Sequence, residues 1–288
     1  MALIVLMCAL WGGNFVSIKV SNRGIPPILA AAARSLVASG LLFAYARLKG
    51  EKVFFQRADL PHGAALGVLF GLDFLLLYWG VAYTDASRAI IFLYTQPLWL
   101  GLGAHLLLPS ERLNWTKGAG LSLSFLGLVV VFGSRSSGLK SLHWIGDLME
   151  VGAAVCWAAT MVYIKRILTY RQVTHIQTLF AQLFFSIPVL VIGVLVFEWG
   201  RPVILGPLIL ANFVYQSVIV AFLSYLLYLW MIHRYPVTRL TSFTFLAPLF
   251  GVLFGGLLLG EMITIVLCVG LALVAAGIYL VNREQSRT

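Results

Sequence analysis

The chain has 288 residues, of which 61% are hydrophobic and only 10% are charged. Because a soluble domain carries about 25% charged residues, this composition excludes a soluble protein and indicates an integral membrane protein. The formal net charge of +10 comes from Lys and Arg residues in short links between apolar runs, without a basic stripe interleaved with aromatic residues. That distribution argues against nucleic-acid binding and agrees with the positive-inside rule.

Ten apolar runs follow one another along the chain. Most are close to the ~20 residues that a helix needs to span a bilayer. The runs cover residues 2–20, 27–46, 62–83, 88–107, 116–133, 144–164, 174–197, 207–232, 237–259 and 263–281. No link between them is long enough for a soluble domain, so the sequence predicts an all-α integral membrane protein with ten transmembrane helices.

The start of the chain gives no sign of a cleaved signal peptide, and its cysteines give no sign of a metal site. The first run begins at Ala2 without a basic segment before it, so we expect a retained helix and not a cleaved signal. Cys8, Cys156 and Cys268 each lie inside an apolar run, with no C-x-x-C or Cys/His cluster. We therefore expect no metal site, no disulfide and no cofactor.

The orientation follows from the Lys and Arg residues in alternate links. With the N-terminus in the cytoplasm, thirteen of them lie inside and six outside. Arg34 is left out of this count because it lies within the second run. The positive-inside rule therefore predicts a multi-pass protein with both termini cytoplasmic.

The two halves of the chain resemble each other. Trp11-x-x-Asn14-Phe15-Val16-x-Ile18-Lys19 matches Trp157-x-x-Thr160-Met161-Val162-x-Ile164-Lys165 at a shift of 146 residues. At shifts of 150 or 151 residues, Pro97, Glu111, Gly120 and Gly127 match Pro248, Glu261, Gly270 and Gly277. We place the first repeat in residues 1–138 and the second in residues 139–288. Each repeat holds five spans, an odd number, so the two must cross the membrane in opposite directions, which is an inverted-topology repeat.

Each repeat carries one proline deep inside an apolar run, Pro97 in the first and Pro248 in the second. A proline inside a helix removes one backbone hydrogen bond and clashes with the carbonyl one turn back. Interrupted spans at matching places of two repeats are typical of a transport site at the repeat interface. We therefore predict that Pro97 and Pro248 act in gating.

Several motifs together carry a resemblance to a known family. They are Trp11-Gly12-x-Asn14-Phe15-x-x-x-Lys19, the prolines Pro97 and Pro248 within their spans, and Leu258-x-Gly260-Glu261. With these motifs the whole chain resembles the EamA-type drug/metabolite transporters, and within them most resembles the YddG-type bacterial exporters of aromatic amino acids. The resemblance implies ten helices in inverted repeats around a central cavity, and efflux of small metabolites across the bacterial inner membrane. Thr160 stands where the first repeat has Asn14, so the two ends of the cavity need not be chemically equivalent.

Aromatic and neutral polar residues gather in the spans that carry these motifs. Aromatic side chains at span ends, such as Trp79 and Trp230, are typical of interface belts, whereas a tyrosine hydroxyl near mid-span needs a partner. The polar residues either bind solute or hold helices together, and the sequence leaves both readings open. The predicted substrate-binding residues are Asn14, Tyr78, Tyr94, Gln96, Trp99, Trp157, Tyr163, Ser224, Tyr225 and Thr244.

Two charged residues fall inside predicted spans, Arg34 in the second and Asp73 in the third. Charges within the membrane are costly and are usually functional or paired. We predict that Arg34 and Asp73 form an intramembrane charge pair. The alternative is that Asp73 binds a substrate ammonium group or carries a proton.

Motifs of other protein classes are absent from the sequence. It has no Gly-rich phosphate loop, no H-E-x-x-H and no G-x-S-x-G, so we expect no enzyme. It also has no charged ring or filter-like segment of a channel. We predict a monomeric carrier in the bacterial inner membrane that exports aromatic and other neutral amino acids by alternating access. The alternative is an exporter of cationic drugs or other small metabolites, with or without proton coupling.

Overall fold

The computed structural model describes residues 2–83, 86–109, 111–133, 143–259 and 265–283, and these fold into helices with no strand among them. Eight helical segments in this part of the chain are long and apolar enough to cross a membrane, and Ala2–Ile18 and Cys268–Arg283 are shorter apolar helices. Each of the ten predicted spans corresponds to one of these helical segments. The predicted all-α fold with ten spans is therefore confirmed. The predicted boundary between the repeats, after residue 138, lies outside the described residues.

The helices have the following bounds in chain order. They are α1 (Ala2–Ser21), α2 (Pro27–Lys49), η1 (Arg57–Asp59), α3 (Leu60–Tyr83), α4 (Ala86–Leu93), α5 (Gln96–Leu107), α6 (Trp115–Gly133), α7 (His143–Tyr170), α8 (His175–Gly193), η2 (Val194–Glu198), α9 (Pro207–Val214), η3 (Tyr215–Ser224), α10 (Tyr225–Arg234), α11 (Val237–Ser242), η4 (Phe243–Phe245), α12 (Leu246–Leu259) and α13 (Ile265–Arg283).

Within the described residues, the fourth, eighth and ninth spans are interrupted within their length, and the seventh ends in the π-helical stretch η2. The interruptions of the fourth and ninth spans coincide with the matched prolines. The fourth span is split into α4 and α5, and the ninth into α11, a 3-10 turn η4 and α12. The eighth span changes from α9 to a π-helical stretch, η3, and back to α10. Such breaks in membrane helices lie where protein surrounds them or where they line a cavity.

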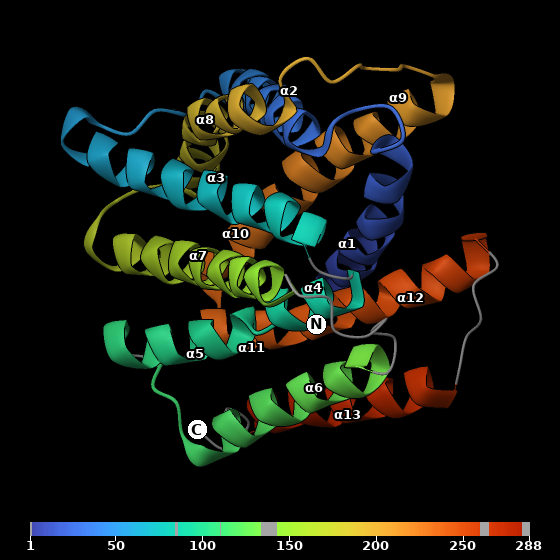
Figure 1. Cartoon of the computed structure of the whole chain (residues 1–288). Helices are drawn as coiled ribbons and strands as arrows, with labels where there is room; N and C mark the ends of the chain where they lie inside the picture. Colours follow the sequence, from blue (N-terminus) through green and yellow to red (C-terminus); the bar gives the residue numbers. More distant parts are fainter. Residues whose placement is uncertain (1, 84–85, 110, 134–142, 260–264, 284–288) are drawn as a thin grey trace.

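The last helices of the two halves, α6 and α13, pack closely against each other (Figure 1). A Cβ at Gly120 would lie 2.7 Å from the Gly277 carbonyl oxygen, and one at Gly127 would lie 2.7 Å from the Gly270 carbonyl oxygen. Only glycine permits this approach. The partners run in opposite order along the two helices, so α6 and α13 are antiparallel, as an inverted repeat requires.

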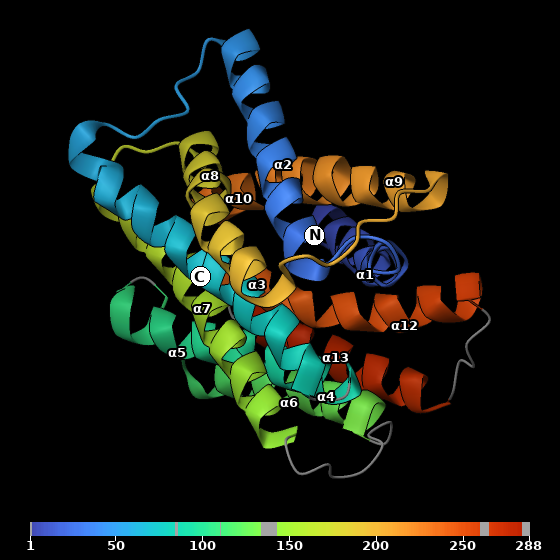
Figure 2. The same cartoon turned by 45° about the horizontal axis from the view of Figure 1, so that its top comes forward.

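The other contacts between the halves also occur in pairs that a two-fold pseudo-symmetry axis relates. The second helix of the first half, α2, packs against η3 of the eighth span, and its counterpart α8 packs against α3 of the third span. Likewise α1 packs against α12, and its counterpart α7 packs against α4 and α5 (Figures 1 and 2). These contacts between the halves are therefore repeated on the opposite side of the pseudo-symmetry axis.

Two buried glutamates each hold the start of a helix on another span. Glu198 accepts hydrogen bonds from the backbone N–H of Ile28 at 3.1 Å and of Leu29 at 2.9 Å. Glu111 accepts them from Val237 at 2.9 Å and from Thr238 at 3.0 Å. Neither α2 nor α11 has a side-chain cap of its own, so a distant carboxylate satisfies the free N–H groups of the first turn.

Candidate substrate cavity

A central cavity lies between the two halves of the chain. Helices α1, α2 and α3 of the first half and α7, α8, η3 and α10 of the second contribute side chains to it. The volume open to the centre of a water molecule is about 120 Å³. This is several times the ~10–15 Å³ that a single buried water requires, so the cavity has room for a small solute.

Four residues that the sequence predicted for binding line this cavity, namely Asn14, Tyr94, Trp157 and Tyr225. Arg34 and Asp73, the two residues of the predicted charge pair, line it as well. These residues come from both halves of the chain and meet only because the halves pack against each other. Their part in binding a substrate stays a prediction.

Aromatic rings form much of the cavity wall. Tyr94 and Trp157 meet edge to face, with ring centres 6.1 Å apart. Trp11 meets Tyr225 at 6.4 Å and Tyr228 at 5.1 Å, again edge to face. Edge-to-face contacts fix ring orientation, so the wall presents a stable apolar surface with hydroxyl groups at a few points.

Ser224 lies behind this wall and positions one of its rings. The indole N–H of Trp11 donates to the Ser224 hydroxyl at 2.9 Å, and that hydroxyl donates to the Val220 carbonyl at 2.6 Å. Ser224 is buried and does not line the cavity. The structure therefore places Ser224, predicted to bind substrate, one layer away from it.

The two intramembrane charges share the cavity, but they do not touch. Arg34 and Asp73 are 2% and 7% exposed. No ion pair within 4 Å joins these two residues, both of which belong to the described part of the chain. The guanidinium carbon of Arg34 lies 4.4 Å from the ring centre of Phe74, and its Nε and Nη2 have no hydrogen-bond partner among the described residues. The two residues therefore share the cavity without a direct ion pair in this conformation, and their pairing stays a prediction.

Neutral polar atoms also face the cavity without partners. The Oδ1 of Asn14 and the Oε1 of Gln182 are buried and accept no hydrogen bond within the described residues. A buried acceptor without a donor is costly, so these oxygens are suited to a ligand or a water. Sequence reasoning missed Gln182, although an amide within so apolar a span was a usable signal.

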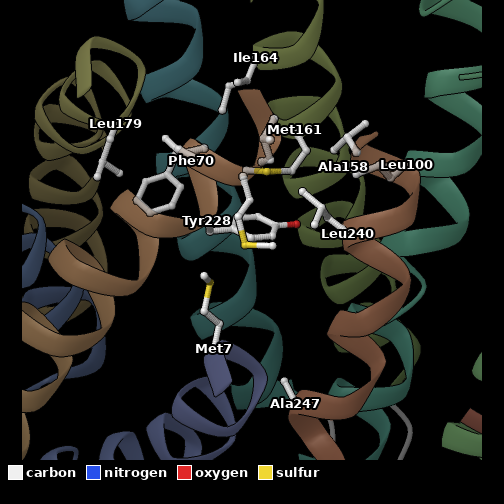
Figure 3. Close-up of a cluster of buried hydrophobic side chains, with 14 of the residues drawn as sticks. Met7, Phe70, Leu100, Ala158, Met161, Ile164, Leu179, Tyr228, Leu240 and Ala247 are labelled. Carbon is white, nitrogen blue, oxygen red and sulfur yellow. The ribbon is translucent and has the colours of Figure 1, made fainter. Parts of the chain in front are cut away.

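The apolar part of the lining was also missed. Phe70, Phe74 and Leu77 line the cavity together with Asp73, at the i, i+3, i+4 and i+7 spacing of one helix face. Figure 3 shows Phe70, Met161 and Tyr228 converging on one region. The spacing around Asp73 could have identified the α3 face from the sequence.

Trp99 and Tyr163 lie elsewhere, which corrects their predicted place in the cavity. Both line a separate groove on the outer face of α7. Trp99 is 40% exposed, and its indole N–H donates to the Thr95 hydroxyl at 3.1 Å. Tyr94 lies at the break between α4 and α5 and lines the cavity, whereas Trp99 lies within α5 and lines the groove. Tyr163 is likewise on a different face of α7 from Trp157.

Three further predicted residues lie within the packing around the cavity. Tyr78 stacks near Phe74 at 6.0 Å between ring centres. Thr244 is fully buried and donates to the Thr241 carbonyl at 2.7 Å. Gln96 is also fully buried, and neither polar atom of its amide has a partner among the described residues. None of the three lines the cavity in this conformation.

The predicted gating prolines both sit just inside the second piece of a broken span. Pro97 is the second residue of α5, and α4 ends at Leu93, four residues earlier. Pro248 is the third residue of α12, and the 3-10 turn before it includes Thr244, also four residues earlier. The proline ring clashes with the carbonyl four residues back, which explains both breaks. Whether these breaks move during transport stays a prediction.

The sequence profile of the EamA-like transporter family matches residues 1–133 and again residues 144–283. Relatives named "Probable amino-acid metabolite efflux pump" occur in Salmonella typhimurium, with 28% identity, and in Escherichia coli, with 26%. Each alignment covers 96% of this chain and 93% of the relative. The "Uncharacterized transporter YoaV" of Bacillus subtilis is 22% identical, with 99% of this chain and 97% of that protein covered. A protein of known crystal structure, 21% identical, shares the fold with a TM-score of 0.80 over 99% of this chain and 98% of its own.

Proposed function

This chain belongs to the EamA-like transporter family, and on that premise we propose that it exports amino acids, aromatic and other neutral ones, by alternating access. Family and relatives make it a multi-pass membrane transporter. One observation carries the choice of substrate. A buried cation and a buried anion, Arg34 and Asp73, face the same cavity without pairing with each other.

An α-amino acid carries one negative and one positive charge. Its carboxylate can pair with Arg34, and its ammonium group can pair with Asp73. Leaving a charge buried and unpaired is costly, and charges inside membrane spans usually serve binding. The planar guanidinium of Arg34 suits a carboxylate, which it can hold through two parallel hydrogen bonds. The carboxylate of Asp73 suits an ammonium group. A zwitterion between them neutralises both.

The aromatic wall accounts for the proposed range of side chains. Trp11, Tyr94, Trp157 and Tyr225 offer ring faces and edges that contact apolar or aromatic groups without demanding one shape. Such a wall provides affinity with low selectivity. The name of two relatives, amino-acid metabolite efflux pump, supports the same substrate class.

The alternative substrate is a cationic drug or another small metabolite, with proton coupling. Asp73 alone would favour a cation. Arg34 in the same cavity opposes it, because a buried guanidinium repels a second positive charge. We therefore place amino acids first.

The broken spans suit alternating access. We propose that the segments around Pro97 and Pro248 bend in turn, so that one mouth of the cavity closes while the other opens. With thirteen basic residues on one side of the membrane and six on the other, we propose a plasma-membrane carrier with cytoplasmic termini that acts as a monomer.

The test pairs truncated ligands with truncated side chains. Purified protein in liposomes is assayed for uptake of labelled phenylalanine, in competition with 2-phenylethylamine, which lacks the carboxylate, and 3-phenylpropionate, which lacks the ammonium. In the wild-type protein we expect unlabelled phenylalanine to compete well for uptake and the two truncated compounds to compete poorly. Arg34→Gln should raise the KM for phenylalanine about 10–100-fold, the size of a lost charged hydrogen bond, and remove the disadvantage of the amine.

In Asp73→Asn, the KM for phenylalanine should rise in the same way. 3-Phenylpropionate, which lacks the ammonium group, should then compete as well as phenylalanine. Repeating the assay with and without a pH gradient separates downhill from proton-coupled export. An unchanged KM for phenylalanine in Arg34→Gln would refute the assignment. Better competition by the amine than by phenylalanine in wild type would instead support the cationic alternative.

A further inference from the structure

A long apolar groove runs along the outer face of α7, away from the central cavity. We refer to it as the α7 groove, and its members include Trp99, Val155, Tyr163 and Arg166. Its lining residues come from α3, α5 and α7. Helix α7 lies between α3 and α5 (Figure 1), so it forms the floor and the other two form the walls. The volume open to the centre of a water molecule is about 740 Å³, much more than in the cavity. The groove therefore has room for a long, flexible molecule.

Small side chains make the groove deep. Ala158 and Ala159 lie on its floor, and Gly103 lies on the α5 wall, where a Cβ would come within 3.3 Å of Val162. Leu106 on that wall is 71% exposed, so the groove opens sideways toward the hydrocarbon of the membrane. Lipid chains are the molecules that this face meets.

The length of the groove matches one leaflet of a bilayer. Its floor extends along α7 from Val155 to Arg166. At 1.5 Å per residue this stretch is about 16 Å long, close to half of the ~30 Å hydrocarbon core. One acyl chain of a single leaflet fits along it.

The end of the groove carries the charge that a phospholipid head group needs. Arg166 is exposed at this end, and among the residues that the structure describes it forms no ion pair. Beside it, the Tyr163 hydroxyl and His62 Nδ1 share a hydrogen bond of 2.6 Å, which adds a polar rim. An arginine fork matches phosphate geometry, and basic residues at the membrane surface attract acidic lipids.

We propose that the α7 groove is a binding site for an acidic phospholipid. Its acyl chain lies along α7, and its phosphate meets Arg166. The chain packs against Trp99, whose indole is hydrogen-bonded to Thr95 at the break between α4 and α5. Bound lipid therefore contacts the interrupted fourth span directly, and this site is independent of the solute in the cavity.

The test uses Trp99 as a reporter. Phosphatidylglycerol with brominated acyl chains quenches tryptophans that it touches, and Trp99→Phe isolates the contribution of Trp99. In mixed micelles we expect brominated phosphatidylglycerol to quench the Trp99 signal at lower concentration than brominated phosphatidylcholine. Arg166→Gln should weaken the apparent affinity for phosphatidylglycerol about five- to tenfold. Arg112→Gln, which changes an exposed arginine that does not line the groove, is the matched control.

Three outcomes would overturn the proposal. One is equal quenching by the two lipids, and another is an Arg166→Gln variant that behaves like Arg112→Gln. The third is a dimer in size-exclusion chromatography that Arg166→Gln dissociates, which would make the groove a contact between copies of the chain. Thermal unfolding with added phosphatidylglycerol provides a second readout, because the lipid should stabilise wild type more than Arg166→Gln.

Discussion

The contact of Glu111 with the start of α11 allows a quantitative prediction. Its two carboxylate oxygens accept from Val237 and Thr238 at 2.9 and 3.0 Å, and the side chain is 3% exposed. In Glu111→Gln one of these oxygens becomes an NH₂ group, which faces a backbone N–H and cannot accept from it. The variant also loses the negative charge at the helix N-terminus.

The expected loss follows from these two terms. One charge-assisted hydrogen bond contributes about 1.5–3 kcal/mol, and a charge at a helix N-terminus about 0.3–1 kcal/mol. We therefore expect Glu111→Gln to lower the free energy of unfolding by about 2–4 kcal/mol. For a large domain, 1 kcal/mol corresponds to about 2–4 °C, so the Tm should fall by about 4–16 °C.

Tryptophan fluorescence during thermal unfolding in detergent, at one scan rate for all variants, measures this change. Glu51→Gln removes an exposed carboxylate in a link and is the control. Glu198→Gln breaks the equivalent contact with Ile28 and Leu29 and should cost a similar amount. The two losses should add, because the two contacts share no residue. If Glu111→Gln unfolds within 1 °C of Glu51→Gln, the carboxylate does not hold the helix start and the reasoning fails.

Three further predictions follow from the fold. Pro97→Ala and Pro248→Ala restore one helix hydrogen bond and should slow transport more than they weaken binding, and normal rates in both would refute bending. Gly120→Val should disrupt the α6–α13 contact and lower Tm, whereas Gly118→Val should not, because a Cβ at Gly118 meets nothing within 4 Å. Equal effects of the two changes on Tm would contradict the close approach of α6 and α13. A cysteine replacing Glu51 should resist membrane-impermeant reagents in intact cells, and labelling from outside would reverse the orientation.

The sequence by itself determined the spans and the interruptions of the fourth and ninth spans. Both are local properties: a run of about 20 apolar residues fits the bilayer wherever it lies in the chain, and Pro97 and Pro248 each clash with the carbonyl four residues back. The interruption of the eighth span contains no proline, and Pro188 lies inside the continuous helix α8, so prolines alone do not locate every break. The internal repeat also anticipated the glycine pairs of α6 and α13, because Gly120 and Gly127 recur as Gly270 and Gly277. In an inverted repeat, equivalent helices of the two halves contact each other at the pseudo-symmetry axis, as α6 and α13 do.

Only the tertiary structure decided which face of each span meets the cavity. Because most spans are apolar on all sides, hydrophobic periodicity does not separate an inner from an outer face unless a charged residue such as Asp73 marks one of them. For this reason Tyr94 and Trp99 looked equivalent in the sequence, yet they face the cavity and the α7 groove respectively. Arg34 and Asp73 could be placed in neighbouring spans, but their separation depends on how α2, α3 and Phe74 pack. The contact of Glu111 with α11 and the groove between three helices have the same origin: they join residues far apart in the chain, and packing between spans, which no local pattern records, brings them together.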